Sequence, residues 1–107
     1  MLLTGILTKE FTYTAAVLGA GATFSGVSSV VRSYRKIRGV VFADQAGTLY
    51  IRQGGAGGQL DEITSLPLAA GVGFGFKIDI VGMYCQVTYT NGGVAQAAFR
   101  LYTYLEP

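Results

Sequence analysis

Regular alternation of apolar and polar residues is the feature that most limits how this chain can fold. Residues 74 to 80 read FGFKIDI, so every second side chain is large and apolar. A period of two places those side chains on one face of a strand and the charged Lys77 and Asp79 on the other. The pattern recurs in residues 83 to 90 and 99 to 105. Because no segment has a helical period and 16 glycines disfavour helices, an all-β protein is predicted.

Turn-forming residues between alternating runs predict two hairpins. The segment TNGG at residues 90 to 93 tolerates the positive φ angles of tight turns, so residues 83 to 105 are predicted to form a β-hairpin. Asp44-Gln45-Ala46-Gly47 divides residues 37 to 53 in the same way and predicts a second one.

Short strands separated by turns about ten residues apart are typical of an antiparallel β-sandwich. Residues 54 to 58 are a predicted flexible connector, followed by a weaker strand from Leu60 to Leu66 that Pro67 ends. The whole pattern predicts roughly seven or eight strands in a sandwich of jelly-roll or related topology, with a small closed β-barrel as the alternative.

The length of 107 residues is that of one domain. The sandwich is predicted to occupy residues 13 to 107, and residues 1 to 12 are predicted to form an N-terminal arm. A free arm would expose five large apolar side chains, which are Leu2, Leu3, Ile6, Leu7 and Phe11. We therefore expect the arm to be buried on a neighbouring subunit or on another protein.

The residues offer no pattern for catalysis, metal binding or cofactor binding. The chain has no histidine, the commonest general base and transition-metal ligand. Asp61 and Glu62 are neighbours and would point to opposite faces of a strand, so they cannot form a glycosidase pair. The glycine-rich stretches lack the residues and the following helix of a nucleotide loop. We expect a protein that is not an enzyme and has no cofactor or metal.

The first residues do not have the pattern of an export signal. No positive residue precedes their apolar run, and Lys9 and Glu10 end it, so no signal peptide is predicted. Residues 15 to 22 fall far short of the roughly 20 apolar residues that cross a bilayer, so no membrane partner is expected. The single cysteine, Cys85, is predicted to be buried and unreactive, which fits synthesis and folding in the cytoplasm.

Half of the eight basic residues lie in the segment RSYRKIR, residues 32 to 38. An aromatic residue among basic ones can stack on nucleic acid. However, Ile37 interrupts the run, so Lys36 and Arg38 would share one strand face, and the net charge of +2 is small. We expect no nucleic-acid partner and interpret the segment as a solvated face or one that pairs with an acidic protein surface.

Tyrosines in outward-facing positions suggest a protein contact. Tyr102 and Tyr104 alternate with buried positions and share their face with Arg100, and a tyrosine buries a large ring yet still offers a hydroxyl. Only 13% of the residues are charged, which also suggests contact with other protein. The candidate interface comprises the five apolar arm residues together with Arg35, Lys36, Arg38, Tyr50, Arg100, Tyr102 and Tyr104.

Two segments carry a family resemblance. SYRKIRGVVFADQAGTLYIRQ and, after a glycine-bearing loop, YCQVTYTNGGVAQAAFRLY resemble small β-sandwich virion proteins of tailed bacteriophages, among them capsid decoration or cement proteins. The resemblance spans residues 22 to 105. It implies a virion protein that binds the major capsid protein or another virion protein, as a homo-oligomer with a trimer favoured. A tail or baseplate component and a carbohydrate-binding module are the alternatives, although tryptophan, a favoured sugar platform, is absent.

Overall fold

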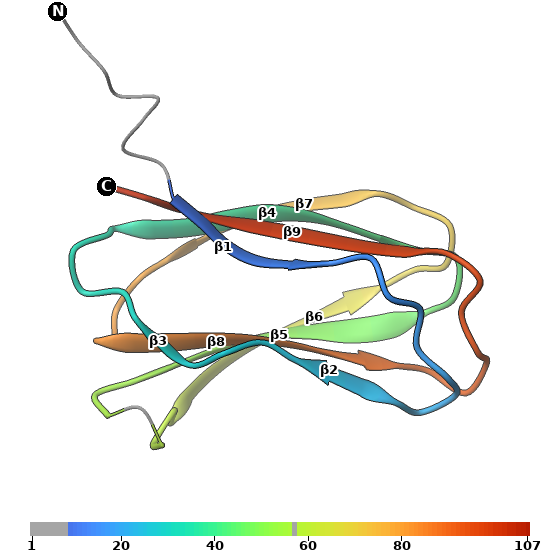
Figure 1. Ribbon diagram of the computed structural model, residues 1–107, viewed down its shortest axis with the longest axis horizontal. Helices are drawn as coiled ribbons and strands as arrows, with labels where there is room; N and C mark the ends of the chain where they lie inside the picture. The colour runs from blue at the N-terminus through green and yellow to red at the C-terminus, as the bar shows by residue number, and fades with distance from the viewer. Residues whose placement is uncertain (1–8, 57) are drawn as a thin grey trace, which may run out of the picture.

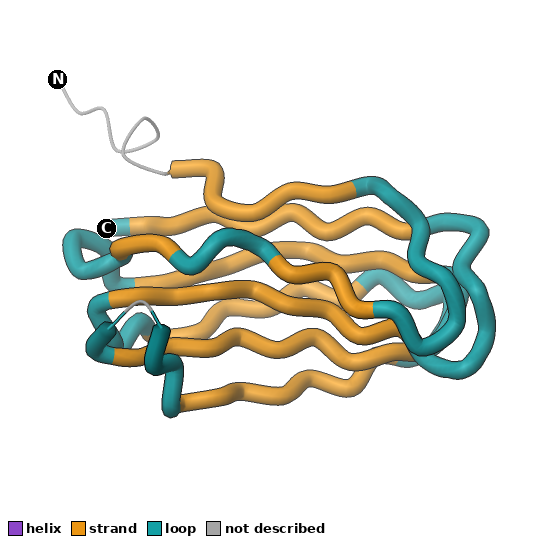
Figure 2. Tube along the Cα trace, turned by 60° about the horizontal axis from the view of Figure 1, so that its bottom comes forward, coloured by secondary structure: helices purple, strands orange, loops and turns teal. Residues whose placement is uncertain are grey.

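Two antiparallel sheets pack face to face in the computed structural model, which describes residues 9–56 and 58–107 (Figures 1 and 2). Sheet A has the strand order β1-β9-β4-β7, and sheet B has the order β2-β8-β5-β6 with β3 also paired to β8. The strands are β1 (Lys9–Thr14), β2 (Thr23–Ser25), β3 (Ser29–Val30), β4 (Lys36–Ala43), β5 (Gly47–Gly54), β6 (Glu62–Leu68), β7 (Phe74–Asp79), β8 (Tyr84–Asn91) and β9 (Phe99–Glu106).

The pairing order is that of a jelly roll. The first strand pairs with the last, β1 with β9, and successively inner pairs follow as β2 with β8, β4 with β7 and β5 with β6. Such nesting makes the chain pass between the sheets at nearly every connection. The predicted all-β sandwich is therefore confirmed, and the closed-barrel alternative is wrong because the two sheets are separate.

The core lies between the sheets and follows the predicted alternation. In β4 every second residue is buried, and in β9 the buried positions alternate with Arg100, Tyr102 and Tyr104. The fully enclosed apolar side chains come from both sheets and include Ile37, Val41, Leu49, Ile51, Cys85, Val87, Tyr89 and Leu101. No helix occurs within residues 9–56 and 58–107, and none of them forms a helix that could cross a membrane.

Both predicted hairpins are wrong. β8 belongs to sheet B and β9 to sheet A, so residues 83 to 105 connect the two layers. β4 and β5 are divided between the sheets in the same way, so residues 37 to 53 also cross from one layer to the other. Among the described strands, β5 and β6 are the two that follow one another in the sequence and also pair directly in a sheet.

The residues interpreted as tight-turn formers instead brace longer loops at one end of the sandwich. The Asp44 carboxylate accepts hydrogen bonds from the backbone N–H groups of Ala97 and Ala98, at 3.1 and 3.2 Å. The Asn91 side-chain amide donates to the carbonyls of Gly19 and Val94, at 2.9 and 2.8 Å. No residue other than glycine has a positive φ in the described part of the chain, so Asn91 does not form the predicted turn.

Two strand boundaries also differ from the predictions. β6 continues through Pro67 to Leu68, which is tolerated because β6 is an edge strand. Residues 9 to 12, assigned to the arm, belong to β1 and pair with β9. The remaining arm positions, Leu2, Leu3, Ile6 and Leu7, lie outside the described residues.

A β-bulge interrupts the pairing of β1 with β9. Glu10 lies opposite Tyr104 and Tyr13 opposite Tyr102, so β1 has one extra residue there. The side chain of Thr103 satisfies the backbone groups of Thr12 at the bulge. Its hydroxyl accepts a hydrogen bond from the Thr12 N–H at 2.8 Å and donates one to the Thr12 carbonyl at 3.1 Å. Both threonines are buried, so β1 depends on this one hydroxyl group.

Replacing Thr103 with valine is expected to lower the free energy of unfolding by about 2 to 4 kcal/mol, because the buried N–H and C=O of Thr12 lose their partner. Serine keeps the hydroxyl and should cost only about 1 kcal/mol for the lost methyl group. Urea denaturation of the two variants checks this. Equal stability of the valine variant and the unchanged protein would contradict the role given to the hydroxyl.

Candidate protein-binding face

The outer surface of sheet A presents two tyrosines and a valine in a row across three strands. Tyr13 of β1 lies opposite Tyr102 of β9, which lies opposite Val40 of β4. The rings of Tyr13 and Tyr102 stack with centroids 4.8 Å apart. Tyr13 is 55% exposed and Val40 is 53% exposed, although the strands beneath them are well packed. We call this surface the tyrosine face, defined by Tyr13, Arg38, Val40, Lys77, Arg100, Tyr102 and Tyr104.

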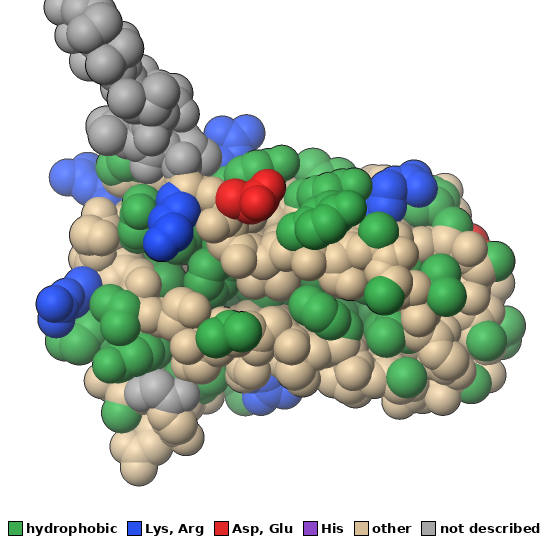
Figure 3. All heavy atoms as spheres, viewed as in Figure 1, with side chains coloured by type: hydrophobic (Ala, Val, Ile, Leu, Met, Phe, Trp, Pro, Cys, Tyr) green, Lys and Arg blue, Asp and Glu red, His purple; other side chains and the backbone are tan. Residues whose placement is uncertain are grey.

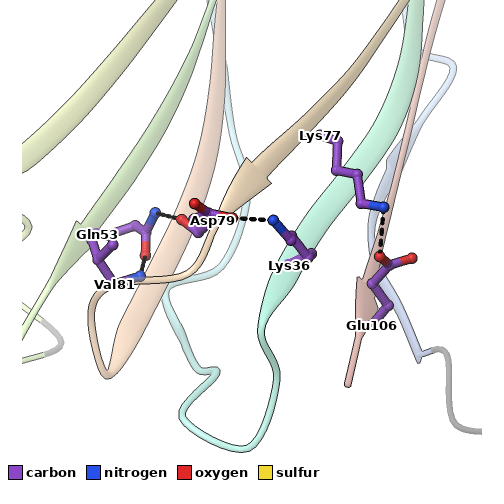
Figure 4. A network of polar contacts seen from close by, with 6 residues as sticks. All are labelled: Lys36, Gln53, Lys77, Asp79, Val81 and Glu106. Carbon is purple, nitrogen blue, oxygen red and sulfur yellow. Dashed lines mark hydrogen bonds and ion pairs between the residues drawn. The ribbon is translucent and has the colours of Figure 1, made fainter.

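A second row on the tyrosine face carries charge. Tyr104 lies opposite Arg38, which lies opposite Lys77. Glu106 accepts from both cations, with Nη1 of Arg38 and Nζ of Lys77 each 3.1 Å from a carboxylate oxygen. Figure 4 shows Lys77 reaching Glu106, and beside them the ion pair of Lys36 with Asp79. Glu10 lies opposite Tyr104 in the same row, so two carboxylates balance the two cations and the row has no net charge.

A shallow hollow of about 440 Å³ opens beside this row. Gly75 of β7 is opposite Val40, and since it has no side chain the floor between Arg38, Lys77 and Tyr104 is open. The hollow is therefore lined by apolar groups, among them Val40, next to the neighbouring pair of cations Arg38 and Lys77. An apolar side chain next to a carboxylate would fit it best.

Arg100 marks the other end of the tyrosine face. Its guanidinium lies over the ring of Phe42, 4.7 Å from the centroid, which is the geometry of a cation–π contact. Figure 3 shows hydrophobic side chains interspersed with basic ones and an acidic one along the upper layer, where Figure 1 places β1, β9 and β4. Exposed aromatic rings with arginine beside them are the composition typical of protein interfaces.

The structure brings five of the predicted interface residues to one sheet, namely Lys36, Arg38, Arg100, Tyr102 and Tyr104. It separates three others from them. Tyr50 lies in β5 of sheet B, and Arg35 precedes β4. Phe11 lies in β1 of sheet A, but it is half-buried and packs against the core and not on the outer face.

Sequence reasoning missed Tyr13, Val40 and Lys77 as members of the tyrosine face. Lys77 was assigned to an outward position, but its neighbour across the sheet was not known. Tyr13 was outside any predicted strand, and Val40 appeared to be one more residue of an apolar run. Only the strand order of sheet A brings the three together.

The outer surface of sheet B is chemically different. A hollow of about 490 Å³ is lined mainly by hydroxyl and amide side chains, among them those of Thr23, Ser25, Gln86 and Thr88. The charged residue in this lining is Arg52. Its Nε donates a hydrogen bond to the Thr88 hydroxyl at 3.3 Å, and its guanidinium lies 5.3 Å from the centre of the Tyr50 ring. The two outer faces would therefore attract different ligands.

The carboxylates near these surfaces are held in their charged form. Hydrogen bonds from the backbone of Ala98 and Ala97 lower the pKa of Asp44. Lys36 lowers the pKa of Asp79, and Lys77 and Arg38 lower the pKa of Glu106. A general acid needs a raised pKa, so none of the three is suited to that role. No cluster of three potential metal ligands occurs among the described residues.

These three carboxylates predict that acid destabilises the protein. A group whose pKa is lower in the folded state stabilises the fold above its unfolded pKa, about 4 for a carboxyl, and this contribution is lost as the pH falls through the folded pKa. The urea midpoint should therefore be steady between about pH 5 and 7 and fall below about pH 4. Asp44→Asn should reduce that fall, and a midpoint that is flat or rises toward acid pH would contradict it.

Cys85 is buried and unpaired, as predicted. Burial raises the pKa of its thiol to about 12, so almost none of it is thiolate at neutral pH. The folded protein therefore presents no reactive thiol at this position.

The fold is that of a small jelly-roll protein, and the outer surface of sheet A, with its exposed tyrosines, is a candidate binding face. The chain belongs to the family described as the N-terminal domain of the uncharacterised protein YqxG, whose model matches residues 3–106. A solved structure, described as the crystal structure of the PBSX exported protein XepA, is similar with a TM-score of 0.75 and 25% identity. The similarity covers 92% of this chain but only 36% of the other chain. No curated protein matches this sequence.

The comparison supports the coarser part of the resemblance found in the sequence, that to phage-associated proteins.

Proposed function

We propose that this protein is a structural component of a phage particle and binds another virion protein through the tyrosine face. The observation that carries the proposal is the exposed row formed by Tyr13, Tyr102 and Val40 on a rigid sheet. The similarity to the exported protein XepA of phage PBSX supports a phage-associated role, in the virion or outside the cell.

The chemistry of the face supports protein rather than solvent as its neighbour. Stacked tyrosines lose little rotamer freedom on burial, and the sheet fixes their positions before the partner arrives, so the entropic cost of binding is small. Arginine over an aromatic ring is a frequent anchor at the centre of interfaces. The same features offer no group for a reaction, so we propose a role in binding without catalysis.

For the particular role we propose capsid decoration, with the major capsid protein as partner, following the resemblance of the aromatic-basic first segment and the segment ending in FRLY. A decoration protein adds buried area across subunit junctions and so strengthens the shell. The description of XepA as an exported protein favours a second candidate, a component of the tail or of a product released from the cell.

Fractionation of purified particles tests the proposal and separates the two candidates. Virions of the encoding phage are separated into heads and tails on a density gradient, and the protein is detected with an antibody. Capsid decoration predicts the protein with heads, in many copies per particle. Finding it with tails or free in the medium would support the second candidate, and its absence from both the particles and the medium would overturn both.

A further inference from the structure

Three of the four sheet edges carry a feature that prevents another strand from pairing. β1 has the bulge between Glu10 and Tyr13, and β6 contains Pro67. β2 has only three residues, and β3, which continues that edge, has two. Bulges, prolines and short strands are the usual protections of edges.

β7, the remaining edge of sheet A, has no such feature. Its six residues pair with β4 without interruption, from Lys36 opposite Asp79 to Val41 opposite Phe74. Its two charged side chains form ion pairs within sheet A, Lys77 with Glu106 and Asp79 with Lys36. Neither is therefore free to protect the edge.

The direction of the backbone groups along β7 shows which of them are open. Ile80 N–H donates to the Arg35 carbonyl at 2.8 Å, toward the β4 side. Because the direction alternates along a strand, the N–H and C=O groups of Gly75 and Lys77 point away from β4. The Asp79 carbonyl also points away, but the side chain of Gln53 donates to it at 2.9 Å. Gly75 and Lys77 therefore offer the groups for a further strand.

The apolar side of β7 is also incompletely covered. Phe74, Phe76 and Ile78 point inward and pack against the core, but each is only half-buried. Ile37 and Val41 on the neighbouring strand are fully enclosed. An additional strand beside β7 would cover the open side of these three side chains.

We propose that β7 pairs with β7 of a second copy, antiparallel around a two-fold axis at Phe76. In this register Gly75 of each copy exchanges backbone hydrogen bonds with Lys77 of the other, and the two Phe76 side chains meet. The Lys77 side chain then lies beside a glycine and has room. A register centred on Lys77 would place the two lysines directly opposite one another, where their like charges repel. A register centred on Ile78 would need the Asp79 carbonyl as an acceptor, but this carbonyl already accepts a hydrogen bond from the Gln53 side chain.

This pairing joins the two A sheets into one continuous sheet. Residues directly opposite in an antiparallel pair point to the same side, so the two tyrosine faces lie next to one another on one surface. Two identical faces held together bind a repeating partner surface more tightly than either does alone. The dimer itself rests on the edge geometry and not on the proposed function.

Two single-cysteine replacements test the register. Gly75→Cys and Lys77→Cys are purified separately and then mixed under mild oxidation, while Cys85 remains buried and unreactive. A Cβ added at Gly75 has no neighbour closer than 3.9 Å, so the variant is expected to fold. Opposite positions in this register are close enough for a disulfide. We expect a linked dimer in the mixture and almost none in either variant alone, and equal cross-linking in all three samples would overturn the register.

A proline at the open edge tests the dimer itself. Lys77→Pro removes an N–H that points away from β4, so the sandwich should tolerate it, whereas the dimer loses two hydrogen bonds. Lys77→Ala is the matched control, since it loses the same ion pair and keeps the N–H. Sedimentation equilibrium over a range of concentrations should show self-association of the unchanged protein and of Lys77→Ala, at least tenfold weaker in Lys77→Pro. A monomer at all concentrations, or equal association of both variants, would overturn the proposal.

Discussion

Gln53→Leu is expected to lower the free energy of unfolding by about 3 kcal/mol, because three partly buried backbone groups lose their partner. Gln53 is 1% exposed in β5. Its amide donates to the Asp79 carbonyl at 2.9 Å, and its carbonyl oxygen accepts from the N–H groups of Val81 and Gly82 at 2.8 and 3.1 Å. Figure 4 shows this side chain linking sheet B to the end of β7.

Gln86→Leu is the matched control for that replacement. Gln86 is half-buried and donates a single hydrogen bond, to the Gly26 carbonyl at 2.8 Å, so its replacement should cost about 1 kcal/mol. Urea denaturation measures both variants. If the two replacements had the same effect, the connection between β7 and β8 would not depend on Gln53.

Gly39→Ala is expected to destabilise the protein by about 3 kcal/mol and to disturb the tyrosine face. A Cβ added at this buried position would lie 2.3 Å from the Tyr102 carbonyl oxygen and 2.8 Å from Cζ of Phe76. The carbonyl belongs to the β9 backbone and cannot rotate away, so the pairing of β4 with β9 must open. The rings that β9 carries would move with it.

Gly75→Ala provides the comparison for Gly39→Ala in the neighbouring strand. Its added Cβ has no neighbour closer than 3.9 Å, and alanine is less costly than glycine in a strand, so a gain of up to about 0.5 kcal/mol is expected. Thermal denaturation of the two variants measures the difference. Similar melting temperatures of Gly39→Ala and Gly75→Ala would mean that the pairing of β4 with β9 accommodates the added methyl group, against our prediction.

The alternation of residue types was sufficient to predict the faces of the strands. Burial of every second side chain is independent of which strand lies alongside, so Leu49, Ile51, Val87 and Leu101 could be assigned to the core before any pairing was known. The outward positions of Arg100, Tyr102 and Tyr104 followed from the same rule. Three of the seven residues of the tyrosine face therefore required only the period of the pattern.

The connections could not be predicted because the same residues serve two kinds of loop. Asp44 and Asn91 are suited to tight turns by their short polar side chains, and the same side chains can hold a distant loop. Here Asp44 bonds to residues more than 50 positions away and Asn91 to the loop after β1, contacts that no local pattern reveals. The bulge of β1 was missed for a similar reason, since the Thr103 hydroxyl that satisfies it is distant in sequence.

The central claim is that the tyrosine face is the contact surface with another virion protein, and paired tyrosine replacements test it most directly. The double variant Tyr102→Ser/Tyr104→Ser removes rings from the tyrosine face, and Tyr50→Ser/Tyr84→Ser removes two from the outer surface of sheet B. Binding of each folded variant to purified phage particles is measured by co-sedimentation. Our account predicts at least tenfold weaker binding for the first variant and little change for the second. Unchanged binding of the first variant, or loss only in the second, would contradict it.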